Sequence, residues 1–252
     1  MIYDIQKASL LKRFSAFLLD LILLVIIATG AGYLVSLASN YNHYYESVQQ
    51  RMDELSKEYN VDLSLSQEEA EQQYSQADYS RFLEAYDRLV ATAGKDYVTM
   101  LSLSVMIVSI GLLVGFVVIE FVVPLCLKNG QTLGKKVFKI GVMQINGIKL
   151  APQALFVRSI LGKYTVETML PVLGVFLIIF GIAPFLGLVL VAGVLIAQIL
   201  FLIINKNHCL IHDLLASTVA VDLSLQMIFD SEQDLVDYKE QIAKEKADKA
   251  SY

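Results

Sequence analysis

The chain has 252 residues, of which 56% are hydrophobic and 18% are charged. With a mean hydropathy of +0.56, this composition is too apolar for a soluble domain and indicates a membrane protein. The 20 Lys and Arg residues against 25 Asp and Glu residues exclude the overall positive charge that is typical of nucleic-acid binding. We therefore expect the lipid bilayer, and no nucleic acid, as a partner.

Three stretches without Asp, Glu, Lys or Arg predict four transmembrane helices. Residues 21–45 and 98–119 can each cross a bilayer once, because about 20 apolar residues span the hydrocarbon layer. Residues 168–205 are long enough for two crossings, with a turn at Pro184. The pattern predicts an all-α membrane protein, with its spans in the segments 1–39, 97–125 and 166–204.

The charges on the connections predict the orientation. Residues 40–96 carry five Lys and Arg against twelve Asp and Glu, whereas residues 126–165 carry seven Lys and Arg and no acidic residue. Lys and Arg beside a span tend to stay in the cytoplasm, so residues 40–96 should be extracytoplasmic and residues 126–165 cytoplasmic. Both termini, including the tail of residues 205–252, should then lie in the cytoplasm of a multi-pass cell-membrane protein.

The extracytoplasmic connection is predicted to form a helical hairpin. Apolar residues spaced by three or four over residues 45–59 indicate one helix. Ser66 and Glu69 have the spacing of a capping box, which predicts that a second helix begins near Gln67. We assign no chemistry to the tyrosines of this segment, because an apolar stripe at helical spacing is typical of core packing.

The cytoplasmic connection is predicted to form a small β-hairpin and an interfacial helix. The pair Asn146-Gly147 between two apolar runs is a strong signal for a hairpin turn. After Pro152, residues 153–164 mix apolar side chains with Arg158, as expected of a helix that lies in the membrane interface.

Three motifs stand out from this apolar background. Arg13 and Asp20 are seven residues apart and so share one face of the first helix. A GQTLGKK run occupies residues 130–136, and an HDLLAST run occupies residues 212–218.

Together these motifs resemble the RDD family of small membrane proteins, which is named for an arginine and two aspartates. The matching residues are Arg13, Asp20 and Asp213, and the resemblance extends to Glu120, the Asn146-Gly147 turn and Arg158. It covers about residues 10–39 and 98–223. The chain departs from the family in its long segment 40–96 and in Ser217, where a glycine is usual. Some members look like cation/proton antiporters or their subunits.

The buried charges each need a partner, because an unpaired charge within a membrane is costly. Arg13 and Arg158 are competing candidates for Asp20, and Lys135 or Lys136 for Glu120. Lys135, Lys136 and Lys139 are also candidates for contact with lipid headgroups.

We expect no metal, no cofactor and no enzymatic activity. His208 and His212 are four residues apart, but a third ligand is not evident. His212 is better interpreted as a hydrogen-bonding neighbour of Asp213.

Two functions remain open. In the first, the protein is a membrane scaffold or an accessory subunit that docks a second copy or another membrane protein. In the second, it is a component of a cation/proton antiporter or another transporter, and Asp20, Glu120 and Asp213 bind protons or monovalent cations. Four spans without an internal repeat are few for a complete alternating-access transporter.

Overall fold

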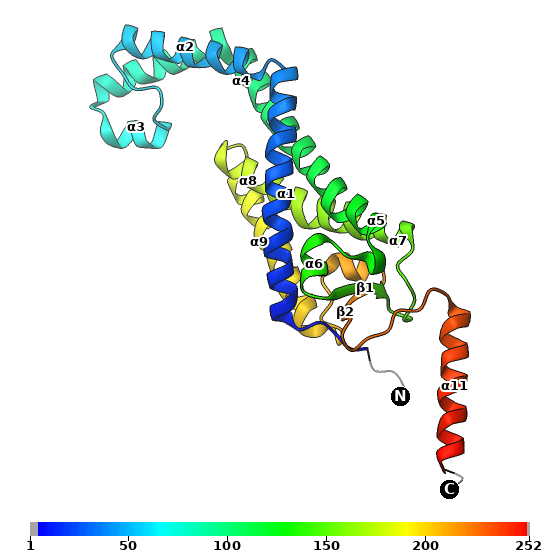
Figure 1. Cartoon of the computed structure of the whole chain (residues 1–252). Helices are drawn as coiled ribbons and strands as arrows, with labels where there is room; N and C mark the ends of the chain where they lie inside the picture. Colours follow the sequence, from blue (N-terminus) through cyan, green and yellow to red (C-terminus); the bar gives the residue numbers. More distant parts are fainter. Residues whose placement is uncertain (1–4, 251–252) are drawn as a thin grey trace. The chain divides into compact units, whose positions relative to one another are not determined.

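The computed structural model describes residues 5–250, apart from the side chains of residue 128 and residues 248–250 (Figure 1). Its helices and strands are α1 (Leu10–Ala38), α2 (Tyr41–Tyr59), α3 (Gln67–Gln73), α4 (Gln76–Phe116), the π-helix η1 (Val117–Val122), α5 (Val123–Cys126), the 3₁₀ turn η2 (Lys128–Gly130), α6 (Leu133–Val137), β1 (Ile140–Gln144), α7 (Pro152–Phe156), the π-helix η3 (Val157–Met169), α8 (Leu170–Ile179), α9 (Pro184–Ile204), α10 (Ile211–Leu215), β2 (Thr218–Asp222) and α11 (Glu232–Ala250).

Within residues 5–250, four helical stretches are long and apolar enough to cross a membrane. They are Leu10–Ala38, Gln76–Cys126, Pro152–Ile179 and Pro184–Ile204. Even the shortest, with 21 residues, extends over about 30 Å, which is the thickness of the hydrocarbon layer. The protein is therefore an all-α membrane protein with a small two-stranded sheet, which confirms the predicted fold class.

The chain divides into two compact units, of which one comprises residues 30–111. This unit contains the end of α1, all of α2 and α3, and most of α4. Its core consists of the buried side chains Leu55, Val61, Leu63, Ala70, Phe82 and Ala85. The predicted capping box is confirmed, since Ser66 Oγ accepts from Glu69 N and the Glu69 carboxylate accepts from Ser66 N.

The second helix predicted within residues 40–96 differs from the prediction in its length. The helix that begins at Gln67 ends at Gln73, and a new helix, α4, begins at Gln76. Ser75 caps this new helix, because its Oγ accepts from Asp78 N at 3.3 Å. From there α4 continues through Gly94 without a break, so the boundary expected between residues 96 and 97 is not a break in secondary structure.

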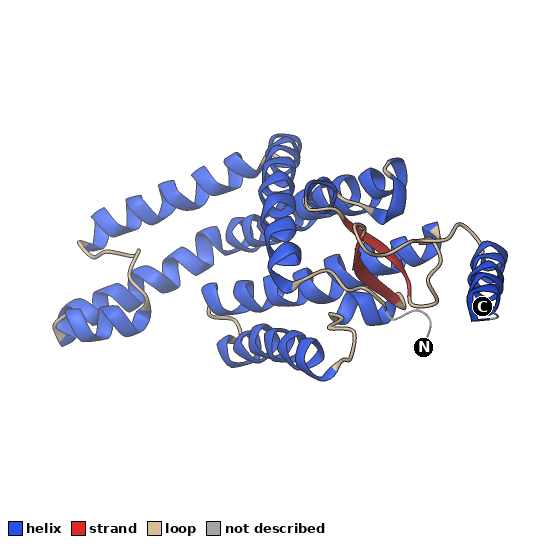
Figure 2. Cartoon of the chain, turned by 60° about the horizontal axis from the view of Figure 1, so that its bottom comes forward, coloured by secondary structure: helices blue, strands red, loops and turns tan. Residues whose placement is uncertain are grey.

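The other unit comprises residues 1–29 and 112–252 and contains the sheet. The strands β1 and β2 pair antiparallel, from Ile140 opposite Asp222 to Gln144 opposite Thr218 (Figure 2). Both strands are buried along almost their whole length. The partner of β1 therefore lies more than 70 positions away in the sequence.

The predicted β-hairpin is thus only partly correct. The turn forms, with Gly147 at a φ of 92° and Gln144 N donating to Ile148 O at 2.9 Å. Beyond it, however, a single bridge joins Met143 to Lys149. The returning strand is short because Pro152 begins α7, whereas β2, with sequence TVAVD, offers five buried residues, of which Thr218, Val219 and Val221 are β-branched.

The predicted interfacial helix is not a separate element. Residues 153–164 belong to one helical stretch from Pro152 to Ile179, in which η3 connects α7 to α8. The turn after it agrees with the sequence, since α9 begins at Pro184. In the hairpin of α8 and α9, a Cβ at Gly187 would lie 2.4 Å from Gly174 O, so the two backbones are in contact.

Candidate functional site

Three acidic residues that the sequence analysis identified are buried in the unit that contains the sheet. Asp20 in α1 is 4% exposed, Glu120 in η1 is 6% exposed, and Asp213 in α10 is 2% exposed. A buried carboxylate requires hydrogen-bond donors or cations around it. The partners of these three groups therefore define what the site can do.

Asp20 is bound by the beginning of α6. Thr132 Oγ1 donates to Asp20 Oδ2 at 2.5 Å, and Gly134 N donates to Asp20 Oδ1 at 2.7 Å. A Cβ at Gly134 would lie 2.3 Å from Ala16 O, so only glycine allows α6 to approach α1 this closely. The expectation that an arginine holds Asp20 is wrong, because a hydroxyl and a backbone amide occupy its two oxygens.

Arg13 instead binds backbone carbonyls that follow α9 and lie in β2. Its Nη1 donates to His208 O at 2.8 Å, and its Nη2 donates to Ala220 O at 2.7 Å. Arg13 thereby fastens the first turn of α1 to the segment on which His208 lies and to the sheet. Its role in the structure is a tie between main-chain segments and not an ion pair with Asp20.

Glu120 lies between two lysines. Lys163 Nζ is 2.5 Å from Glu120 Oε1, and Lys135 Nζ is 3.4 Å from Glu120 Oε2. Lys135 was one of the two candidates from the sequence, whereas Lys163 was not considered. The only signal for Lys163 was its place in the basic, acid-free connection.

The backbone around Glu120 is π-helical, and the carbonyl oxygen of Glu120 accepts a hydrogen bond from another helix. In η1 the Val123 amide donates to Val118 O, five residues back. Ser159 Oγ donates to Glu120 O at 2.6 Å, so a side chain of η3 satisfies a carbonyl of η1. The two π-helices η1 and η3 therefore contact each other through Glu120 of η1 and through Ser159 and Lys163 of η3.

Arg158 and Asp213 form a buried ion pair. Arg158 Nη1 donates to Asp213 Oδ1 and, at 2.7 Å, to Thr218 Oγ1. Thr218 Oγ1 lies 3.1 Å from the same Asp213 oxygen. Burial alone would raise the pKa of Asp213, but Arg158, with His212, outweighs it and holds that pKa below its usual value.

His212 has a different main partner from the one expected. Its Nδ1 and its backbone N both lie 2.8 Å from Glu167 Oε1, whereas its Nε2 is 3.6 Å from Asp213 Oδ2. Burial lowers the pKa of His212 in spite of both carboxylates. Glu167 was missed, although it is the first acidic residue after the acid-free connection.

The three lysines proposed for lipid headgroups divide into two kinds. The side chain of Lys135 is only 12% exposed and is directed to Glu120, so its assignment to lipid headgroups is wrong. Burial lowers the pKa of Lys135 to about 8, although Glu120 opposes this shift. Lys136 and Lys139 are exposed.

The arrangement is a set of linked polar contacts that hold separate elements together. It connects α1 to α6, η1 to η3, and η3 to α10 and β2. Among residues 5–247, the structure contains no group of three or more His, Cys, Asp or Glu side chains that could hold a metal ion. These contacts therefore stabilise the packing of elements that are far apart in the sequence.

The comparison with protein families identifies these motifs. A model of the RDD family matches residues 7–217, which is most of the chain. The chain belongs to the RDD family. No curated protein and no solved structure matches it.

In this RDD protein, Ser217 occupies the position where the family resemblance implies a glycine. The tight turn is nevertheless present, because Ser217 adopts a φ of 51°. This is the left-handed region that glycine enters at little cost and other residues avoid. The turn joins α10 to β2, and it therefore places Thr218 beside Asp213.

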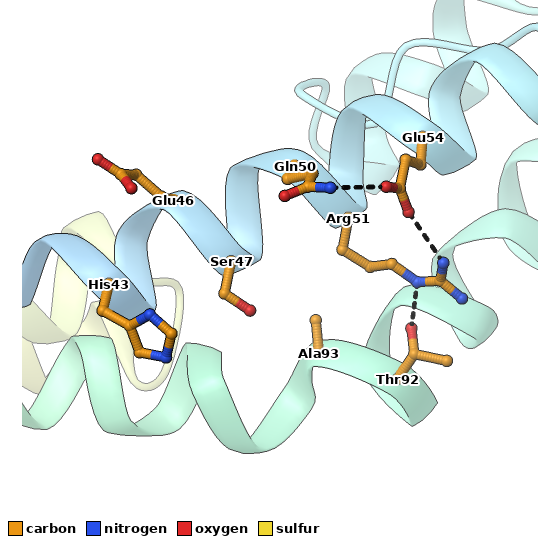
Figure 3. A pocket seen from close by; sticks show the side chains of 8 residues that line it. All are labelled: His43, Glu46, Ser47, Gln50, Arg51, Glu54, Thr92 and Ala93. Atoms are coloured by element: carbon orange, nitrogen blue, oxygen red, sulfur yellow. Dashed lines mark hydrogen bonds and ion pairs between the residues drawn. The ribbon is translucent and has the colours of Figure 1, made fainter.

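The long segment of residues 40–96 of the RDD protein carries a pocket of about 400 Å³ between α2 and α4 (Figure 3). Four of its polar side chains bind one another. Glu54 accepts from Gln50 Nε2 at 3.0 Å and from Arg51 Nη1 at 3.0 Å, and Arg51 Nε donates to Thr92 Oγ1 at 3.1 Å. These four lining side chains thus have partners within the pocket, and it does not alter the interpretation of the segment as packed helices.

Proposed function

We propose that this RDD-family membrane protein is a scaffold or accessory subunit that does not transport ions on its own. The observation that carries the proposal is that Asp20, Glu120 and Asp213 are all buried and all held by donors within the chain. A carboxylate that binds a transported proton or cation has to exchange partners during the cycle. Here each exchange would leave a buried lysine, arginine, amide or hydroxyl without its acceptor.

One observation favours the alternative, a cation/proton antiporter or transporter component. Lys135 contacts Glu120 and has a pKa of about 8, so it can lose its proton near neutral pH. A lysine that is deprotonated beside a carboxylate is a plausible proton carrier. Such a transporter would need a second copy or another membrane protein, since the chain contributes four candidate spans.

A flux measurement distinguishes the two functions. The purified protein is reconstituted in liposomes that contain a pH-sensitive dye, and a Na⁺ or K⁺ gradient is imposed. We expect no movement of protons above that of protein-free liposomes. Cation-driven acidification or alkalinisation that Glu120→Gln abolishes, with Glu58→Gln as the exposed control, would overturn the proposal in favour of transport.

The proposal includes the orientation in the cell membrane, with both termini in the cytoplasm. Its support is the charge difference between residues 40–96 and residues 126–165. We design the test on exposed positions: single cysteines at Glu71 and at Ile145, in a chain with Cys126→Ser and Cys209→Ala. In intact cells a membrane-impermeant thiol reagent should label only the cysteine at position 71. Labelling at position 145 contradicts the orientation.

A scaffold or accessory subunit also needs a surface that contacts a second copy or another membrane protein. In the proposed orientation, the unit of residues 30–111 and the basic connection are two surfaces on which a partner can dock. Chemical crosslinking in membranes, from the same single cysteines at positions 71 and 145, reports which surface approaches a second copy or another protein. If no crosslink forms from either position, both surfaces are removed from the proposal.

A further inference from the structure

The short helix α6 exposes an apolar side that no part of the described chain covers. Gly134 is buried against α1, whereas Leu133 is 40% exposed and Val137 is 66% exposed. Leu133 lies within the GQTLGKK run, and Val137 directly follows it. Exposed apolar side chains on a helix that is otherwise anchored to a span indicate contact with a partner or with lipid.

The contact with α1 shows at which depth α6 lies. Gly134 touches α1 at Ala16 and Asp20. The remainder of α1, residues 21–38, extends over about 27 Å, which is close to the thickness of the hydrocarbon layer of about 30 Å. The level of Ala16 and Asp20 is therefore the edge of the hydrocarbon layer, where acyl chains meet headgroups.

Side chains of α1 at the same level support this placement. Phe14 is 57% exposed, Phe17 is 53% exposed and Leu18 is 42% exposed. They lie within four residues of Ala16 in the sequence. An apolar surface that involves two neighbouring elements at one depth is typical of a membrane interface.

Two lysines beside this apolar side have no carboxylate partner among the described residues. Lys12, Lys149 and Lys163 each pair with a carboxylate. Lys136 and Lys139 are exposed, and neither has an acidic partner within the part of the chain that the structure describes. Two free ammonium groups that follow an apolar face at the edge of the hydrocarbon layer fit the phosphate groups of lipids.

We propose that α6 and Lys139 form a binding surface for anionic phospholipids. Leu133 and Val137 contact the acyl chains near the headgroups, and the ammonium groups of Lys136 and Lys139 bind the lipid phosphates. Asp20, through Thr132 and Gly134, holds this surface at a fixed depth on α1. The inference does not depend on whether the protein transports ions.

The chain contains no tryptophan, so one introduced tryptophan is a specific fluorescent reporter. We place it by Val137→Trp and reconstitute the protein in liposomes that contain a small fraction of lipid with brominated acyl chains, which quench tryptophan on contact. The brominated lipid is either phosphatidylglycerol or phosphatidylcholine. Leu195→Trp, exposed in the middle of α9, is the control for a lipid-facing position. Val236→Trp, exposed in α11, is the control for a position outside the proposed surface.

We expect brominated lipid to quench the tryptophan at position 137, and brominated phosphatidylglycerol to quench it at least about twofold more effectively than brominated phosphatidylcholine. Lys136→Gln with Lys139→Gln should reduce this ratio to that of Leu195→Trp. Arginine at both positions should restore it, and Lys149→Gln should leave it unchanged. Absence of quenching at position 137, as expected if a protein covers α6, overturns the proposal. Equal quenching by the two lipids, or a ratio that the glutamine substitutions leave unchanged, overturns it as well.

Discussion

The side chains of Arg158 and Asp213 meet inside the protein and join η3 to α10, although 55 positions separate them in the sequence. Neither group reaches water, and Thr218 completes the contact. Removal of one partner leaves a buried charge without compensation.

We therefore expect Arg158→Gln or Asp213→Asn alone to lower the free energy of unfolding by about 3–5 kcal/mol. The double substitution should lower it by less than the sum of the two, because it leaves no lone charge. The check is a double-mutant cycle of thermal unfolding in one detergent. The exposed pair Arg88 and Glu58 is the matched control, and there the cycle should show almost no coupling. Additive losses at Arg158 and Asp213 would contradict the pairing.

Gly134→Ala should destabilise the protein by about 2–3 kcal/mol, because the new methyl group would collide with Ala16 O and the Asp20 carboxyl group. Gly193→Ala in α9 is the control, since a Cβ there meets nothing within 4 Å. Thermal unfolding in detergent measures both. Equal effects of the two substitutions would show that α6 does not approach α1 closely.

Ser217→Gly should raise the free energy of unfolding by about 0.5–1 kcal/mol. The substitution removes the strain of a left-handed serine, and the greater flexibility of glycine in the unfolded chain offsets a part of this gain. Ser217→Val should lower the stability, because a β-branched residue adopts this φ even less readily. The same unfolding measurement decides, and a Ser217→Gly variant less stable than the native chain would be contrary to the prediction.

Lys135 predicts how stability depends on pH. Its pKa is about 8 in the folded protein and near 10.5 when unfolded, so between these values the unfolded chain binds the extra proton. Stability from this group must then rise as the pH increases from about 8 to about 10.5. Measured from pH 7 to 10, the native chain should gain stability relative to Lys135→Met. The difference isolates Lys135 from the other groups that titrate, and a relative loss would be inconsistent with the lowered pKa.

Local sequence signals predicted several elements of this fold. Charge-free stretches located the apolar helices, the pair Ser66 and Glu69 located the start of α3, and Pro184 located the start of α9. Each of these features depends on residues within a few positions of one another. Interactions of short range in the sequence are the ones that periodicity and capping rules describe.

The partners of the buried charges could not be derived in this way. The sequence identified Asp20 as a group that needs a partner, but its partner Thr132 lies 112 positions away. An arginine was expected because a buried carboxylate is commonly paired with a cationic side chain. In the structure, the close approach of α6 to α1 at Gly134 instead provides a backbone amide as the donor. The pairing of β1 with β2 was missed for the same reason, since a nearby turn at Asn146 and Gly147 offered a local alternative.

The π-helix η1 also sets the direction in which Glu120 points. A π-helical turn accommodates one residue more than an α-helical turn, and each residue of an α-helix advances by about 100°. Deletion of one residue between Val117 and Ile119 would restore α-helical geometry and rotate Glu120 by about that angle relative to α4. The direction of α4 and the polar contacts of Glu120 thus depend on one additional residue in η1, so that a change in the length of this segment would break the contacts of Glu120 with Lys135 and Lys163.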